Sequence, residues 1–163
     1  MIARRRFVAL AVALATSAVS LPRVTEAQGG KPHVEILVLY AKKDPAGAHV
    51  DPQVPKIPQL SQPPFNAYNS FAFVDRKTLA LDALKAVDPW KGKPSATYAL
   101  VTGKSLEVAL LDQRPDKRFE MAAALGKDSP DRLRWTAPGD EPFYIAGQSY
   151  KDGILVIGIT LRP

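Results

Sequence analysis

Residues 143–161 read FYIAGQSYKDGILVIGITL, with two apolar runs on either side of Lys151-Asp152-Gly153. Asp-Gly is a favoured pair where a hairpin needs a positive φ, so the two runs are predicted to form a β-hairpin. The second run, 154–161, is apolar on both of its faces, which is typical of a strand covered on both sides. The stretch therefore predicts a sheet in which the last strand is central.

The rest of the chain after residue 30 repeats this pattern of short apolar runs, at the spacing of an all-β domain. The first run, Val34–Lys42, is also apolar on both faces and is predicted to be a strand buried on both sides. The other predicted strands are 71–74, 97–101, 106–111, 119–125 and 132–136, of which the last four form two hairpins. We therefore predict an all-β fold, an antiparallel β-sandwich or barrel-like domain with at most one short helix.

The expected helix is Thr78–Val87, because Leu81, Leu84 and Val87 recur at helical offsets and Asp88-Pro89 is a plausible helix end. The alternative is that residues 78–81 continue the strand at 71–74. Both interpretations stay open from the sequence.

A long connection, residues 44–64, shows no periodicity and contains six of the 15 prolines. Pro52, Pro55 and Pro58 recur every three residues, which is the repeat of a polyproline II helix. Residues 51–65 thus form a Pro-rich extended segment with two interpretations. It is either a stiff recognition arm for a partner or, as we favour, an ordered connection crossing the sheet. In the second case the apolar side chains tucked against the sheet are Val54, Ile57, Leu60 and Phe65.

Residues 1–27 have the layout of a cleaved secretory signal peptide. Three arginines at 4–6 precede an apolar run, Phe7–Leu21, and Thr25-Glu26-Ala27 supplies small residues before a cut after Ala27; a cut after Ser20 is the alternative. The apolar run is shorter than the roughly 20 residues of a spanning helix, so no transmembrane anchor is expected after cleavage.

The string Arg4-Arg5-Arg6-Phe7-Val8 also resembles the twin-arginine export motif, so both this route and the general secretory route fit. We expect an exported protein, with the periplasm favoured over release from the cell. Residues 28–163 are then one β-rich domain, of a size that suits a single core.

Composition excludes several functions. Without residues 1–27 the chain has 18 Lys and Arg against 15 Asp and Glu, so half of the net charge of +6 belongs to the leader. No Lys/Arg cluster follows, and nucleic-acid binding is not predicted. The chain has no cysteine, which excludes a disulfide framework, thiolate chemistry and a lipid-modified cysteine.

The sequence contains no complete cofactor, metal or nucleophile motif. Gly103-Lys104-Ser105 ends like a phosphate-binding loop, but Tyr98 stands where the motif needs its first glycine, and a strand follows instead of a helix. His33 and His49 lack further ligands at metal-binding spacing. The chain has no Gly-x-Ser-x-Gly elbow. We therefore expect neither a cofactor nor a metal.

Aromatic residues are more suggestive of binding. Trp90 lies in a loop-like context, Tyr68 belongs to an aromatic cluster with Phe65, Phe71 and Phe73, and Tyr144 belongs to a second cluster with Phe143 and Tyr150. Exposed, these rings would form a sugar-stacking or protein-binding surface; buried, they would cap the open ends of a sandwich. The candidate surface residues are thus Trp90, Tyr68, Tyr144 and the three regularly spaced prolines, Pro52, Pro55 and Pro58.

Three functional hypotheses follow. The leading one is a non-enzymatic cell-envelope domain that binds or assembles with an envelope protein, its oligomeric state left open by the sequence. The second is a small-ligand or glycan-binding domain that uses exposed Trp and Tyr rings. The third is a hydrolase with an unrecognised carboxylate pair, drawn from Glu107, Glu120, Asp140 and Glu141.

Overall fold

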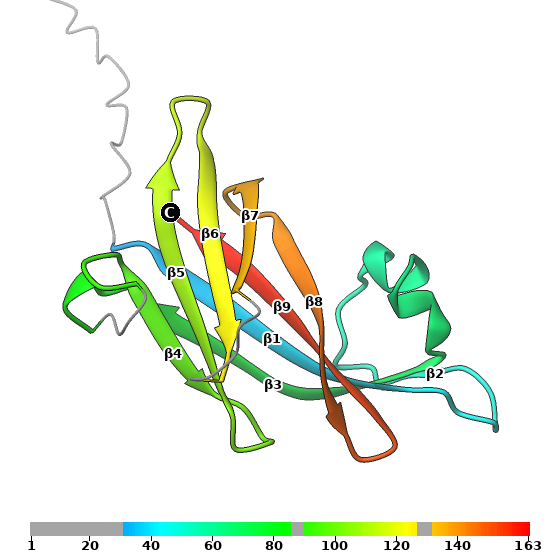
Figure 1. Ribbon diagram of the computed structural model, residues 1–163. Coiled ribbons are helices and arrows are strands. Elements are labelled where there is room, and N and C mark those ends of the chain that lie inside the picture. The colour runs from blue at the N-terminus through cyan, green and yellow to red at the C-terminus, as the bar shows by residue number, and fades with distance from the viewer. Residues whose placement is uncertain (1–30, 86–89, 127–131) are drawn as a thin grey trace, which may run out of the picture.

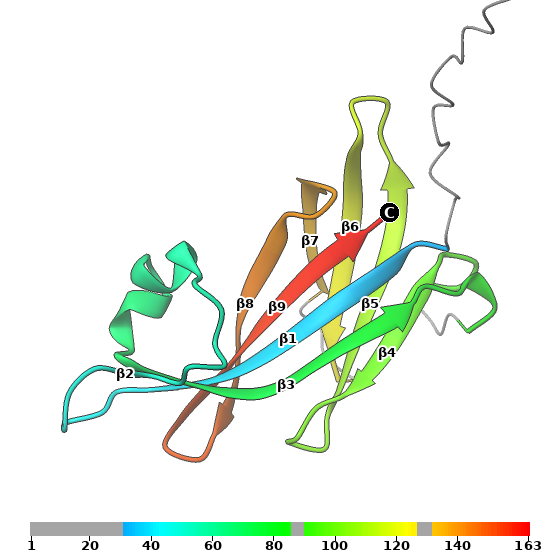
Figure 2. The same ribbon diagram turned by 180° about the vertical axis from the view of Figure 1, so that it is seen from behind.

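The computed structural model describes residues 31–85, 90–126 and 132–163, and it is built from strands (Figures 1 and 2). The predicted signal peptide lies outside the described residues. The structure has two sheets, and its helical elements are short 3-10 turns. The all-β prediction is therefore confirmed. Within the described part of the chain, no helix has the length and apolar character that crossing a bilayer requires.

The larger sheet has five strands in the order β2-β3-β1-β9-β8. Its members are β1 (His33–Lys42), β2 (His49–Val50), β3 (Ser70–Ala80), β8 (Pro142–Tyr150) and β9 (Gly153–Arg162). All neighbours are antiparallel except β2, which runs parallel to β3. The predicted last strand, β9, lies between β1 and β8, inside the sheet as its apolar faces indicate.

The smaller sheet has four antiparallel strands in chain order. They are β4 (Ser95–Ala99), β5 (Ser105–Gln113), β6 (Arg118–Leu125) and β7 (Arg132–Pro138). The hairpins predicted for β4–β5, β6–β7 and β8–β9 are all present.

The main core lies between the two sheets. One face of β1 and β9 supplies its buried centre, and the facing residues of β5 and β6 complete it. The fully buried members include Ile36, Ile157 and Ile159 from the five-stranded sheet and Leu106 and Met121 from the four-stranded sheet. Stacking of Trp135 on Phe143, with ring centroids 4.4 Å apart, joins β7 to β8 across the edge of this core.

The opposite face of β1 and β9 is also apolar, as predicted. We call this face, which points away from the four-stranded sheet, the outer face of the five-stranded sheet. Leu39 and Ala41 of β1 and Val156 of β9 are buried there in a second apolar cluster. The central strands therefore need a cover on each side.

Two local predictions need correction. The helix expected over Thr78–Val87 is wrong at its start, because β3 continues to Ala80 and only Ala83–Lys85 forms a 3-10 turn. Residues 86–87 lie outside the described residues. In the β8–β9 turn the positive φ, 52°, belongs to Lys151 and not to Gly153. Gly153 is required because a Cβ there would lie 2.1 Å from the carbonyl oxygen of Ala41.

Gly158, in the middle of β9, makes room for an aromatic ring. It pairs across the strands with Tyr144, and a Cβ at this position would lie 2.7 Å from Cε1 of Tyr144. The Tyr144 ring also packs edge-on against Phe65, at a centroid distance of 6.4 Å. Position 158 therefore requires glycine because the Tyr144 ring lies over it.

We expect Gly158→Val to lower the free energy of unfolding by about 1–3 kcal/mol, because the new side chain must displace Tyr144 from a packed position. This loss of stability is opposite to what the preference of strands for valine over glycine would predict. Urea denaturation followed by circular dichroism measures the change. Thr160→Val, two residues along the same strand face, is the control; equal stability of the two variants would refute the explanation.

Candidate functional site

The Pro-rich segment forms the second cover of the five-stranded sheet. Residues 51–68, called the Pro-rich layer here, lie on the outer face beside β2, at the end of the sheet opposite to the C terminus (Figures 1 and 2). Val54, Leu60 and Phe65 are buried against it, as the favoured interpretation predicted, and Ile57 is partly buried.

The free polyproline II arm is the wrong alternative. Its three-residue repeat gives way to a 3-10 turn at Pro58–Ser61, and the apolar side chains between the prolines are held by the sheet. Pro52, Pro55 and Pro58 themselves remain exposed on the outer surface of the layer.

Hydrogen bonds between Asp44 and Asn69, called the polar clamp here, join the two ends of the connection between β1 and β3. The Asp44 N–H donates to Oδ1 of Asn69 at 2.6 Å, and Nδ2 of Asn69 donates to the Asp44 carbonyl oxygen at 2.9 Å. The Asn69 N–H also donates to the carbonyl oxygen of Lys42 at 3.2 Å. Because Asn69 satisfies both backbone groups of Asp44, the layer leaves and re-enters the sheet at one fixed point.

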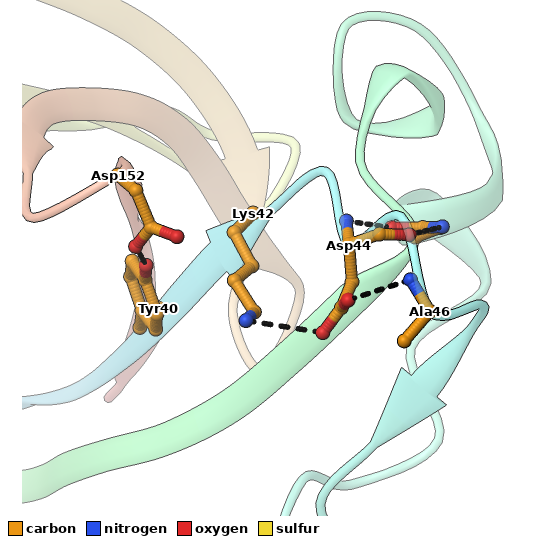
Figure 3. Close-up of polar contacts among 6 residues, drawn as sticks. Tyr40, Lys42, Asp44, Ala46 and Asp152 are labelled. Carbon is orange, nitrogen blue, oxygen red and sulfur yellow. Dashed lines mark hydrogen bonds and ion pairs between the residues drawn. The ribbon is translucent and has the colours of Figure 1, made fainter.

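Charged side chains extend this clamp along the end of the sheet (Figure 3). Lys42 Nζ lies 3.0 Å from Asp44 Oδ2, and Asp44 Oδ1 accepts the N–H of Ala46 at 3.0 Å. The Ala46 hydrogen bond and then the Lys42 ion pair lower the pKa of Asp44. The hydroxyl of Tyr40 on β1 donates to Asp152 in the turn of the β8–β9 hairpin and lowers the pKa of that carboxyl.

An apolar pocket of about 530 Å³ opens between the Pro-rich layer and the end of the sheet. Its lining combines buried layer residues with exposed rim residues. Val50 of β2 is 54% exposed and lies beside the other apolar groups of the lining. The apolar part of the lining is Val50, Val54, Pro55, Ile57, Leu60, Tyr68 and Phe71, and the polar part is Lys56, Ser61 and Asn66.

The edge of β2 beside this pocket is unpaired by any described strand. The His49 N–H donates to the Asn69 carbonyl and the Asp51 N–H donates to the Phe71 carbonyl, both at 2.9 Å. Since backbone groups alternate in direction along a strand, those of Val50 point away from β3. The pocket thus adjoins one free backbone N–H and C=O.

A second, smaller pocket of about 210 Å³ shares Pro55 with the first and is charged. Glu35 lies between two arginines, with 3.3 Å from Oε1 to Arg76 Nε and 3.3 Å from Oε2 to Arg162 Nη2. Arg162 Nη1 also contacts Asp140 Oδ1 at 2.7 Å. Burial raises the pKa of the Tyr144 hydroxyl at this pocket, and nearby Arg76 opposes the rise.

The structure divides the predicted surface residues among three places. Tyr68 and Pro55 line the apolar pocket, and Tyr144 and Pro55 line the charged one. Pro52 and Pro58 lie on the layer outside both linings. Trp90, considered as an exposed stacking ring, is only 3% exposed because it packs on alanines of the four-stranded sheet. The ring is buried, as the alternative predicted, but it covers a face of the four-stranded sheet and does not cap an open end of the sandwich.

Residues that the sequence did not single out complete both pockets. Nothing in the sequence indicated that Val50 is exposed beside a pocket, because its exposure depends on how β2 pairs with β3. Glu35, Arg76 and Arg162 lie on three strands and meet only through the register of β3, β1 and β9. Their charges were visible, but their proximity was not.

The structure does not bring together the strand carboxylates considered for a hydrolase. Glu107 pairs with Ala124, four residues from Glu120 on β6, which is about 13 Å along the strand. Glycosidase carboxylates stand roughly 5–9.5 Å apart. Among the described residues, no group of three His, Cys, Asp or Glu side chains is placed to hold a metal ion.

Comparisons of the chain with protein-family models, with curated proteins and with solved structures give no match.

We expect Asn69→Ala to destabilise the protein by about 1–3 kcal/mol, because two hydrogen bonds to the Asp44 backbone are lost. Hydrogen exchange should show reduced protection at the layer amides of Val54 and Leu60, with smaller changes on β5 and β6. Asn66→Ala, at an exposed position of the same layer, is the control. A uniform loss of protection across both sheets would contradict a clamp on the layer.

Stability should also fall in acid through Asp44 and Asp152. Their folded pKa values lie below the ordinary 3.8, so their stabilisation is complete above that pH and is lost as the pH falls through the lowered values. Thermal unfolding between pH 5 and pH 2 should show a smaller loss in Asp152→Asn than in the wild type. Glu141→Gln, in the exposed β7–β8 turn, is the control, and identical pH profiles for both variants would exclude the contribution of Asp152.

Proposed function

We propose that this protein is an exported, non-enzymatic cell-envelope domain that binds another protein through the apolar pocket of the Pro-rich layer. The observation that carries the proposal is Val50, a 54% exposed apolar residue on the rim of a pocket lined by apolar groups. Val50 and the pocket beside it offer an apolar contact into which a side chain of a partner can insert. The export component rests on residues 1–27.

The shape of the site favours an extended segment of the partner. The free backbone groups of Val50 lie on the outer edge of β2, and β2 is the first strand of the sheet order. An extended peptide can add to such an edge through main-chain hydrogen bonds, while a side-chain pocket supplies specificity. An apolar side chain of the added segment would fill the space between Val50, Tyr68 and Phe71.

The two pockets together suit one partner. They meet at Pro55, so a segment that lies across the layer reaches both the apolar lining and the Glu35–Arg162 group. Aromatic and arginine side chains commonly carry most of the energy of an interface. Tyr68, Tyr144, Arg76 and Arg162 are therefore the residues expected to surround the bound segment.

A small apolar ligand is the second candidate, favoured by the volume of the first pocket. About 530 Å³ lies within the roughly 300–1,000 Å³ typical of small-molecule sites. The half-buried Tyr68 ring offers one apolar face and one hydroxyl for such a ligand. Thermal-shift measurements with a glycan and lipid panel distinguish this candidate from a protein partner.

Val50→Asp should weaken recovery of the partner by about tenfold, because a carboxylate would be buried in the apolar contact. The measurement is pull-down after in-cell crosslinking in the native host, quantified against the wild type. Val101→Asp, an equally apolar and 45% exposed residue in the β4–β5 turn, is the matched control. Recovery of the protein only as a free monomer, or equal losses in the two variants, would count against the proposal.

A further inference from the structure

The four-stranded sheet has a hollow of its own, on the face turned away from the core. The space measures about 600 Å³ and lies on different strands from the Pro-rich layer. Six of its lining residues are charged: Lys91, Lys93, Asp112, Glu120, Arg132 and Arg134. Trp90 and Leu111 supply the apolar part of its wall.

Small side chains create this hollow. Ala109 of β5 and Ala122 and Ala124 of β6 are buried on the same face, and the Trp90 ring packs against them. Because alanine side chains are short, the ring of Trp90 can lie close to the backbone of β5 and β6 and cover this part of the sheet. The outward residues of β7 then stand above this floor as the opposite wall.

A tight turn holds two lysines at the Trp90 side. The Lys93 N–H donates to the Trp90 carbonyl oxygen at 2.8 Å, and Gly92 between them has a φ of 78°. This left-handed conformation favours glycine, so the position of Lys91 and Lys93 follows from the sequence of the turn. Lys93 Nζ also donates to the Leu111 carbonyl at 3.0 Å, which places its charge at the wall of the hollow.

Two arginines face the lysines from β7. Arg132 and Arg134 alternate with Leu133 and lie on the same strand face, about 7 Å apart along the chain. The Arg132 guanidinium lies 6.0 Å from the centre of the Trp90 ring. The hollow is thus bordered by cations on both walls.

The balance of charge in the lining is positive. Four cationic side chains stand against two carboxylates, and one of these, Glu120, already contacts Arg114 at 3.7 Å. Like charges gathered around a concave surface raise the local concentration of oppositely charged ligands. The excess of cations therefore points to an anionic occupant.

The Trp90 indole adds an independent observation. Its Nε1 is buried and has no hydrogen-bond acceptor within residues 31–85, 90–126 and 132–163. A buried donor without an acceptor costs stability, and such groups in native structures are rare. Because Trp90 also lines the hollow, its indole reports on what enters there.

We propose that this hollow is a binding site for a small polyvalent anion, a ligand that carries two or more carboxylate or phosphate groups. Arg132 and Arg134 bind one anionic group through their planar guanidinium forks, and Lys91 and Lys93 neutralise another from the opposite wall. The volume is that of a typical small-molecule site.

The test is a fluorescence titration of the full chain carrying Trp135→Phe. The sequence has two tryptophans, so this variant leaves Trp90 as the sole indole, beside the proposed site. Pyrophosphate and citrate are the probes at low ionic strength, and they distinguish phosphate from carboxylate ligands. We expect a saturable change in Trp90 emission with at least one probe.

Charge-matched variants test whether binding is local. Arg132→Gln with Arg134→Gln should weaken binding of the responding probe at least tenfold. Lys77→Gln with Lys104→Gln removes two exposed cations elsewhere and should change the affinity less than twofold. Circular dichroism confirms that both double variants are folded. The absence of saturable binding of either probe, or equal weakening by the two double variants, would overturn the proposal.

The outcome is independent of the protein-binding function proposed above. Val50→Asp alters the apolar pocket and leaves the hollow unchanged, whereas the arginine variants leave the Pro-rich layer unchanged. Failure of one proposal is therefore distinguishable from failure of the other.

Discussion

Burial of β1 and β9 on both faces is the constraint on which the rest of this structure depends. Ile36 and Ile157 point toward the four-stranded sheet, whereas Leu39 and Val156 point the opposite way, and all four are buried. Apolar area removed from water stabilises a fold by roughly 25 cal/mol per Å². A chain without cysteine must obtain its stability from such burial, so both faces of the central strands need a cover.

The two covers differ, and the difference locates the candidate site. The four-stranded sheet supplies a regular, hydrogen-bonded layer over one face. The other face is covered by a proline-rich connection whose few inward side chains, Val54, Leu60 and Phe65, cannot fill the whole surface. Pockets remain where this irregular layer ends, and the Asp44–Asn69 clamp fixes its position. In many proteins, binding residues likewise lie on loops that a rigid scaffold holds in place.

The strands and hairpins were predictable because each depends on local apolar patterning. Which aromatic residues are exposed was not predictable, as Trp90 shows. Its burial depends on Ala109, Ala122 and Ala124, which are distant in sequence and are brought beneath the ring only by the pairing of β5 with β6. The Glu35–Arg76–Arg162 group likewise depends on strand order, with a bulge between Val38 and Leu39 shifting the register of β1 against β3. Local patterns carry no information on such registers.

The charged pocket holds paired ions and one half-buried phenol. Glu35 is shared by two guanidinium groups, so its charge is compensated in the folded protein. The Tyr144 hydroxyl has a pKa raised by burial and is therefore protonated at neutral pH, where it can donate a hydrogen bond. A general acid or base works best with a pKa near the working pH, and Tyr144 is shifted away from it. Under the proposed function, the partner would meet fixed donors, paired charges and an adjoining apolar pocket, which are features that give protein interfaces their specificity.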